Sequence, residues 1–174
     1  ALECIQVGYT SVMFDGSHLP VEENLEKARK VVEFAHANGV SVEAEVGTIG
    51  GEEDGIIGKG ELAPIEDAKA MVATGIDFLA AGIGNIHGPY PANWKGLHLD
   101  HLQKLTEAVP GFPIVLHGGS GIPDDQIQAA IKLGVAKVNV NTECQIAFAN
   151  ATRKFVAEYE ANEAEYDKKK LFDP

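Results

Sequence analysis

Residues 113–141 have the sequence PIVLHGGSGIPDDQIQAAIKLGVAKVNVN, which predicts two β-strands separated by a helix. The apolar runs Pro113–His117 and Ala136–Val140 predict the strands, because strands buried on both faces of a parallel sheet are apolar throughout. Between them, Pro123 precedes an apolar stripe at helical spacing, and Gly134 ends this stripe. The stretch therefore predicts one strand–helix–strand unit.

The same pattern extends toward the N-terminus. Three more runs predict strands at Ser11–Asp15, Ser41–Val46 and Asp77–Ala81. Apolar stripes predict helices at Pro20–Asn38, from Leu99 to Ala108, and from Ala147 to Tyr159. The five strands begin about 31 residues apart on average, which is the length of one strand–helix unit.

Five units are fewer than the eight of a (β/α)8 barrel, which needs roughly 250 residues. The 174 residues begin in a helix-like segment, Ala1–Gly8, with no strand before it. We therefore predict an α/β fold in which residues 1–174 form a single domain, about the last five βα units of a (β/α)8 TIM barrel. Roughly the first three strands and the final helices are expected to be missing. An open, doubly wound five-stranded sheet is the alternative.

The amino-acid composition and the net charge exclude several classes of protein. Apolar residues make up 45% and charged residues 23% of the chain, which favours a packed core over disorder. The net charge of −12 argues against binding to nucleic acid or to an anionic membrane surface. The sequence has no apolar run long enough to span a membrane, and from its first residues we expect no signal peptide. The two cysteines form no disulfide framework, so we expect a cytoplasmic protein.

Polar side chains and glycines follow the C-terminal ends of the predicted strands, where (β/α)8 barrels carry their catalytic residues. His87 and His117 both lie at such ends, and neutral imidazoles at neighbouring strand ends can share one Zn²⁺. Glu45 and Asp15 are either oxygen ligands or salt-bridged carboxylates. The remaining histidines are interpreted as surface residues (His36, His98, His101) or left ambiguous (His18).

Two glycine-rich segments add to this site. Gly118-Gly119-Ser120-Gly121 precedes a helix, and its backbone amides predict a phosphate site together with Asn139, Asn141 and the helix-capping Thr142. The other segment, Gly47–Glu61, predicts an irregular lid, on which Glu52, Glu53 and Asp54 could move a proton. Turn-forming glycines and a solvated acidic loop are the alternatives.

The stretches EAEVGTIGGEEDG (43–55), GIGNIHGPY (82–90), VLHGGSGIP (115–123) and KVNVNTE (137–143) resemble the bacterial, metal-dependent class II fructose-1,6-bisphosphate aldolases. Class II tagatose-bisphosphate aldolases are close relatives. The resemblance covers essentially the whole chain and places it on the fourth to eighth βα units of that barrel. It implies zinc-dependent, reversible cleavage of fructose 1,6-bisphosphate into dihydroxyacetone phosphate and glyceraldehyde 3-phosphate, a lyase step of glycolysis and gluconeogenesis.

The resemblance also implies roles for single residues. His87 and His117 match two of three zinc-binding histidines, Glu45 and Asp15 match a second or alternate metal position, and Glu53 matches the residue that exchanges a proton at the dihydroxyacetone carbon. Gly88, Gly118, Gly119 and Ser120 match the region of the substrate phosphate and a monovalent cation, and Asn139, Val140, Asn141 and Thr142 match the other side of that phosphate.

The family's third zinc histidine and catalytic aspartate match positions before Ala1, and an arginine for the second phosphate matches a position after Pro174. Three alternatives therefore stay open: a tagatose-1,6-bisphosphate substrate, an inactive fragment, and a Schiff-base aldolase with Lys137 as nucleophile. We interpret Lys137 as a residue at the opposite, N-terminal end of its strand. The expected partner is a sugar bisphosphate, in a homo-oligomer (dimer or tetramer).

Overall fold

The computed structural model describes residues 1–53, 56–58 and 60–161, with side chains described for residues 1–51 and 60–159. Two compact units, residues 1–140 and 141–174, are described separately. In chain order the elements are α1 (Leu2–Gln6), β1 (Ser11–Phe14), α2 (Val21–Ala37), β2 (Ser41–Val46), β3 (Gly50–Glu53), β4 (Ile56–Gly58), α3 (Ile65–Val72), β5 (Phe78–Ala81), β6 (Ile86–His87), α4 (Leu99–Ala108), β7 (Ile114–Leu116), α5 (Asp124–Lys132), β8 (Val135–Val138) and α6 (Thr142–Ala161).

A parallel five-stranded sheet organises the first unit. Its strands follow the order β1-β2-β5-β7-β8, so each strand pairs with the next predicted strand along the chain. A doubly wound sheet reverses its strand order at a switch point, which this sheet does not do. The doubly wound alternative is therefore wrong, and all five predicted strands are confirmed, with ends that differ by at most two residues.

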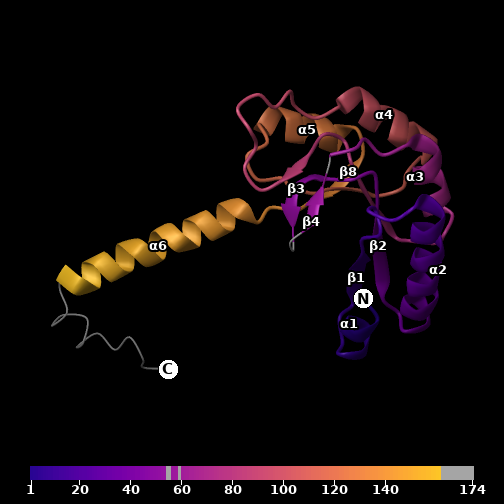
Figure 1. The fold of residues 1–174 in the computed structure, drawn as a ribbon, viewed down its shortest axis with the longest axis horizontal. Helices are drawn as coiled ribbons and strands as arrows, with labels where there is room; N and C mark the ends of the chain where they lie inside the picture. Colours follow the sequence, from indigo (N-terminus) through magenta and orange to yellow (C-terminus); the bar gives the residue numbers. More distant parts are fainter. Residues whose placement is uncertain (54–55, 59, 162–174) are drawn as a thin grey trace. The chain divides into compact units, whose positions relative to one another are not determined.

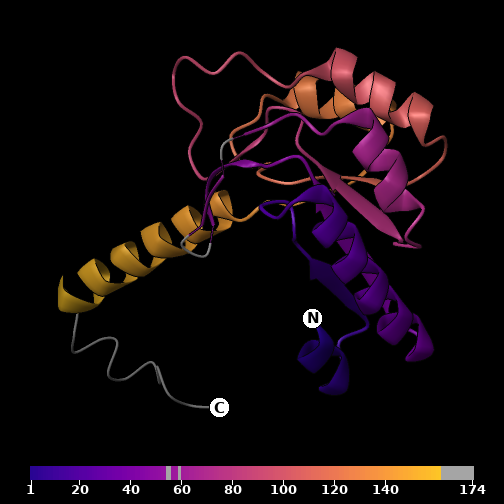
Figure 2. The same cartoon turned by 45° about the vertical axis from the view of Figure 1, so that its right-hand side comes forward.

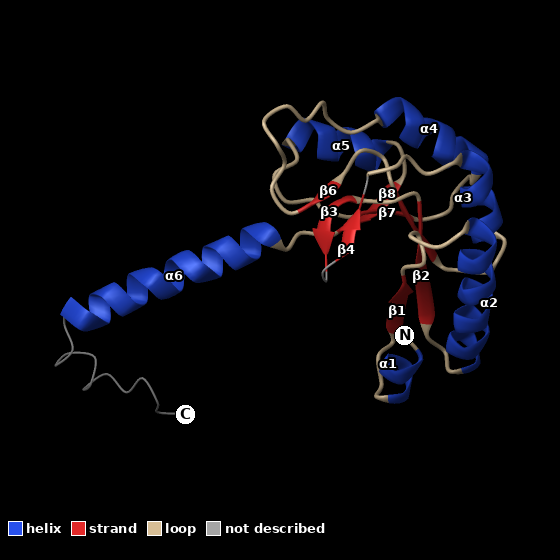
Figure 3. Ribbon diagram, in the orientation of Figure 1, coloured by secondary structure: helices blue, strands red, loops and turns tan. Residues whose placement is uncertain are grey.

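Helices α2, α3, α4 and α5 lie along the outer side of the sheet (Figures 1 and 3). The two views in Figures 1 and 2 both show α2 alongside β1 and β2. The core between helices and sheet includes Leu25 and Ala28 of α2, Met71 of α3, and Leu102 and Leu105 of α4. The helix α3 was not among the predicted elements, although Pro64 at its N-cap and its buried Ala68 and Met71 are typical helix signals.

Strand β2 shows how the sheet separates core from site. Its Val42, Ala44 and Val46 belong to the hydrophobic core. Successive side chains of a strand point to opposite faces, so Glu43 and Glu45 lie on the face opposite to the helices. Both glutamates are only 3% exposed, which places two carboxylates in the interior of this unit.

The segment Gly47–Glu61 is more regular than predicted. It contains β3, which pairs in parallel with β6, and β4, which pairs antiparallel with β3. Gly51 has φ +89°, and a Cβ atom there would lie 2.1 Å from the carbonyl oxygen of His87. This glycine is therefore required for close strand pairing, and the interpretation of the glycines as a sign of an irregular lid was wrong here. Residues 54, 55 and 59 lie outside the described residues.

The second unit consists, in its described part, of the helix α6. The predicted helix from Ala147 to Tyr159 is confirmed and begins earlier, at Thr142. The amide of Gln145 donates a hydrogen bond to the carbonyl of Asn141, so Asn141 rather than Thr142 stands before the first helical residue. None of the helices in the described ranges is long and apolar enough to cross a membrane.

Candidate metal centre

Two imidazoles meet where strands of two different sheets end. His87 ends β6, and His117 directly follows β7. The two rings have centroids 5.6 Å apart and planes at 89°, so one ring presents its edge to the other. His117 is 5% exposed and His87 is half-buried. The predicted approach of these two side chains, 30 residues apart in sequence, is confirmed.

A buried carboxylate that the sequence analysis did not select holds one of these rings. The ring nitrogen Nε2 of His117 lies 2.8 Å from Oε1 of Glu43, and Oε2 of Glu43 accepts a hydrogen bond from the ammonium of Lys137. Burial raises the pKa of Glu43, but the hydrogen bonds from His117 and Lys137 outweigh this effect and hold the pKa below its usual value. The spacing of Glu43 and Glu45, two residues apart in one strand, was the signal available in the sequence.

The contact with Glu43 changes the interpretation of Lys137. Its ammonium forms an ion pair with the carboxylate of Glu43, and the other oxygen of the same carboxylate contacts the His117 ring. The interpretation of Lys137 as a residue remote from the site was therefore wrong. A nucleophilic lysine must present a free amine to its substrate, whereas Nζ of Lys137 is engaged by Oε2 of Glu43. The structure thus argues against the Schiff-base alternative.

The other two candidate ligands form a carboxylate pair. Burial raises the pKa of Glu45 to about 7, and the negative charge of Asp15 contributes to the same shift. Oε1 of Glu45 has a long contact of 3.4 Å to the amide of Ile49. The exposed Asp15 accepts a hydrogen bond of 2.8 Å from the amide of Ser17. Glu45 is therefore a carboxylate whose charge is poorly compensated by its surroundings.

Asn85 fixes the backbone beneath the two histidines. Its side chain is 1% exposed, and its Nδ2 donates to the carbonyl of His117 at 3.0 Å. Its Oδ1 accepts from the amide of Ile83 at 2.9 Å. This amide side chain therefore joins the end of β7 to the segment that leads into β6.

Tyr90 joins the same two segments through its hydroxyl group. Its hydroxyl accepts from the amide of Ile86 at 3.0 Å and donates to the carbonyl of Gly118 at 2.9 Å. Burial raises the pKa of this phenol. Gly118 has φ +66°, and a Cβ atom there would lie 2.1 Å from the carbonyl oxygen of Ile86. Neither Tyr90 nor this close approach could be recognised from residue spacing.

The glycine-rich turn after β7 differs in part from the predicted phosphate cradle. The amide of Gly119 donates to the carbonyl of Asn139 at 2.8 Å, so it already has a partner within the chain. Helix α5 begins at Asp124, and its first turn contains two acidic residues, Asp124 and Asp125. Acidic side chains already occupy the positive end of the helix dipole, and they repel an approaching anion.

The other predicted phosphate residues lie in different surroundings. Ser120 is 7% exposed. Gly88 has φ +84°, and open space surrounds the position of a Cβ atom there. Asn139 and Val140 end the first unit, whereas Asn141 and Thr142 belong to the second unit and are described with it. The phosphate role of these residues stays a prediction.

The described residues alone supply an incomplete ligand set. Among them, no group of three or more His, Cys, Asp or Glu side chains is arranged to hold a metal ion. Glu53 ends β3, but its side chain lies outside the described side chains, as does the whole of Asp54. The predicted proton-transfer role of this segment is therefore untested.

The remaining four histidines lie on other segments of the chain. His18, His36 and His98 are exposed, and Nε2 of His36 lies 2.9 Å from Oδ2 of Asp77. His101 is half-buried, and its Nε2 lies 2.7 Å from the carbonyl oxygen of Ala63. The surface prediction was therefore correct for His36 and His98 but only in part for His101.

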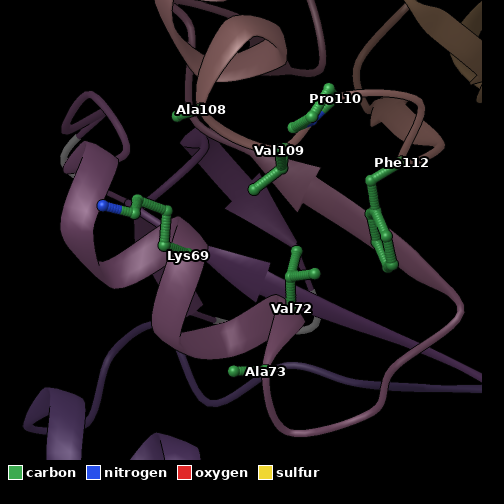
Figure 4. A pocket seen from close by; sticks show the side chains of 7 residues that line it. All are labelled: Lys69, Val72, Ala73, Ala108, Val109, Pro110 and Phe112. Carbon is green, nitrogen blue, oxygen red and sulfur yellow. The ribbon is translucent and has the colours of Figure 1, made fainter.

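A separate apolar pocket of about 340 Å³ lies between α3 and the segment that follows α4 (Figure 4). Lys69, Val72, Ala73, Ala108, Val109, Pro110 and Phe112 line it. None of the candidate site residues lines this pocket, and its walls carry a single charged side chain. It is therefore distinct from the histidine site.

The chain is similar to proteins of one family along its whole length. The family model of class-II fructose-bisphosphate aldolase matches residues 1–174. The chain is 90% identical to a fructose-bisphosphate aldolase of Streptococcus pneumoniae and 86% identical to one of Streptococcus pyogenes, in each case over all 174 residues. It spans 59% of the length of these relatives.

Solved structures agree with this similarity. A fructose-1,6-bisphosphate aldolase structure from Coccidioides immitis matches with a TM-score of 0.82 at 36% identity, over 87% of this chain and 55% of that chain. The YdjI aldolase of Escherichia coli matches with a TM-score of 0.70 at 34% identity, over 87% and 52%. These neighbours confirm the predicted α/β fold of a partial barrel. The chain belongs to the class-II fructose-bisphosphate aldolase family.

Proposed function

We propose that the protein carrying this chain is a zinc-dependent aldolase, which cleaves fructose 1,6-bisphosphate reversibly into dihydroxyacetone phosphate and glyceraldehyde 3-phosphate. Within it, residues 1–174 would be the C-terminal portion of one TIM-barrel domain, without roughly its first three strands and its final helices. The observation that carries the proposal is the pair of imidazoles at the ends of β6 and β7, with ring centroids 5.6 Å apart, in a chain of this family.

The histidine pair fits a zinc ion as two of its ligands. Zinc–nitrogen bonds are about 2.0–2.1 Å long, and catalytic zinc sites use three protein ligands and one open position. Two imidazoles with centroids 5.6 Å apart can both reach one ion. The third ligand would be the histidine that the resemblance places before Ala1. When bound, the metal would act as a Lewis acid that stabilises negative charge on the substrate oxygens.

The chain's own residues would then perform the other tasks. Glu53 would add or remove the proton at the carbon beside the substrate carbonyl. Asp15 and Glu45 would provide oxygen ligands for a second divalent metal position, and a cation there would compensate the charge that burial disfavours on Glu45. The substrate phosphate and a monovalent cation would lie at Gly88, Gly118, Ser120, Asn139, Val140, Asn141 and Thr142, with Gly119 shaping the turn.

The names of the streptococcal relatives favour fructose over tagatose bisphosphate as the substrate. They also favour a role in glycolysis and gluconeogenesis and therefore a cytoplasmic protein. We further propose a homo-oligomer, a dimer or tetramer. A coupled assay that compares fructose and tagatose 1,6-bisphosphate, together with light scattering of the purified protein, tests these points.

The decisive experiment measures metal content and cleavage of fructose 1,6-bisphosphate in the full-length protein. A chelator should abolish cleavage, and Zn²⁺ should restore it. His117→Ala should weaken Zn²⁺ binding by about 100-fold or more, since removing a ligand costs more than removing a residue that only orients one. His36→Ala, which removes an exposed histidine, is the matched control and should bind Zn²⁺ normally. Cleavage that survives chelation, with a borohydride-trapped adduct on Lys137, would contradict the zinc mechanism.

A second measurement concerns the 174-residue chain by itself. It should show no turnover with added Zn²⁺, because the third histidine and the aspartate implied by the resemblance are missing from it. Loss of a positioned proton donor alone typically costs on the order of 10²–10⁴ in rate. Turnover close to that of the full-length protein would show that the ligand set has been assigned wrongly.

A further inference from the structure

We propose that Glu43, paired with Lys137, is a positioning residue for His117: it holds the imidazole with the proton on Nε2 and leaves Nδ1 to bind the metal. This inference rests on the proposed metal function. It concerns two residues to which the family resemblance gave no role in metal binding.

The assignment of the proton follows from the donors and acceptors. A lysine ammonium can only donate hydrogen bonds, so Oε2 of Glu43 accepts from Lys137. The carboxylate that pairs with this ammonium has only acceptors left, and its Oε1 lies 2.8 Å from Nε2 of His117. Nε2 must therefore donate. In a neutral imidazole the other nitrogen, Nδ1, then carries the lone pair that a metal needs.

Burial makes this arrangement specific. Glu43 is 3% exposed and His117 is 5% exposed, so bulk water has little access to replace either partner. The backbone carbonyl of His117 is held independently by Nδ2 of Asn85 at 3.0 Å. The ring and the backbone of the same histidine are thus fixed from two directions, by β2 and by the segment before β6.

Lys137 completes the arrangement through its charge. A buried carboxylate without a cationic partner is strongly unfavourable, and Lys137 supplies that partner from β8. The side chain of Lys137 is itself 47% exposed, so part of it stays in contact with water while its ammonium contacts the buried Glu43. Lys137 therefore acts on His117 only through Glu43.

Metal affinity of the full-length protein tests the inference without any assay of turnover. We expect Glu43→Gln to weaken Zn²⁺ binding by about 10- to 100-fold, measured by competition with a chelator. Lys137→Met should weaken binding less, by up to about 10-fold, and Lys137→Arg should restore it because the positive charge is kept. Glu66→Gln and Lys69→Met break an exposed ion pair on α3 and serve as matched controls with unchanged affinity.

Histidine ¹⁵N NMR of the metal-free protein gives a second readout, which a purely structural role for Glu43 would not produce. His117 should be protonated on Nε2 in the unsubstituted protein, and Glu43→Gln should reduce this preference, because an amide can also donate to the ring. Lys137→Met keeps the test open if Glu43→Gln does not fold, since a half-exposed position tolerates substitution.

The outcomes separate the two proposals. Equal metal affinity of Glu43→Gln and the unsubstituted protein would overturn the positioning role but leave the zinc function intact. A His117 ring protonated on Nδ1 would overturn the inference as well. If the unsubstituted protein binds no metal, the proposed function fails, and the NMR signal of His117 alone decides whether Glu43 sets its tautomer.

Discussion

The two halves of the candidate site differ in how their charges are compensated. The histidine side consists of Glu43, His87, His117 and Lys137, and its carboxylate has donors on both oxygens. The carboxylate side consists of Asp15 and Glu45, where burial and then the negative charge of Asp15 raise the pKa of Glu45. Glu43 and Glu45 are equally buried in the same strand, yet the pKa of Glu43 is lowered and the pKa of Glu45 is raised.

This difference shows that the partners, and not the depth of burial, decide the charge of a carboxylate in this fold. Desolvation is the largest influence on both groups and acts in the same direction. Glu43 keeps its charge because His117 and Lys137 offset the cost of burial. The histidine side is thus preorganised by the chain alone, whereas the carboxylate side is satisfied by a proton or by a cation from outside.

The largest expected effect comes from filling the close approach on the histidine side. Gly118→Ala should destabilise the full-length protein by about 3 kcal/mol, because the left-handed conformation costs an alanine about 1–2 kcal/mol and the Cβ atom would collide with the Ile86 carbonyl. Gly111→Ala is the matched control, with φ +74° and open space around its Cβ position. Gly111→Ala should lower the free energy of unfolding only by the cost of the left-handed conformation, about 1–2 kcal/mol. Equal losses of unfolding free energy in the two variants, measured by urea unfolding, would contradict the close contact between Gly118 and the Ile86 carbonyl.

The next effect concerns the carboxylate side and pH. The raised pKa of Glu45 means that its contribution to stability is complete below pH 4.5 and is lost as pH rises through about 7. With about 1.4 kcal/mol for each pKa unit, the metal-free full-length protein should lose on the order of 3 kcal/mol relative to Glu45→Gln between pH 4.5 and 8. Glu66→Gln, at an exposed position, should leave the pH profile unchanged. Parallel profiles for Glu45→Gln and the unsubstituted protein would refute the poor compensation of Glu45.

The smallest effect concerns the hydroxyl that joins the two histidine segments. Tyr90→Phe should destabilise the protein by about 1–2 kcal/mol, because the amide of Ile86 and the carbonyl of Gly118 both lose a partner. Tyr9→Phe, at a residue that is 60% exposed, is the control and should change stability by less than about 0.5 kcal/mol. Thermal unfolding compares the two. Equal midpoints would show that water replaces the Tyr90 hydroxyl.

The sequence was informative where periodicity reflects burial. Strand β2 was predicted with both ends correct, because its apolar residues Val42, Ala44 and Val46 are the ones that the fold buries in the core. The approach of His87 and His117 was predicted from their places after two predicted strands and is confirmed. The structure differs in one respect, because His87 lies on β6 of the three-stranded sheet and not directly at the end of β5.

The sequence was not informative where a contact depends on the three-dimensional register of distant segments. Glu43 meets Lys137 across 94 positions of the chain, and no spacing rule connects them. The glycines of Gly47–Glu61 suggested flexibility, but at Gly51 the missing side chain allows strand β3 to approach β6. A glycine in a flexible loop and a glycine at a close strand contact look the same in a sequence. Only the position of the neighbouring strand distinguishes the two.

The pairing of β3 with β6 has a structural consequence. In the strand register Gly50 lies opposite Ile86 and Gly51 opposite His87, so the backbone that leads to Glu53 is hydrogen-bonded to the strand that carries a histidine of the pair. The candidate proton-transfer residue therefore lies on a strand whose register is fixed by the strand that carries a candidate metal ligand.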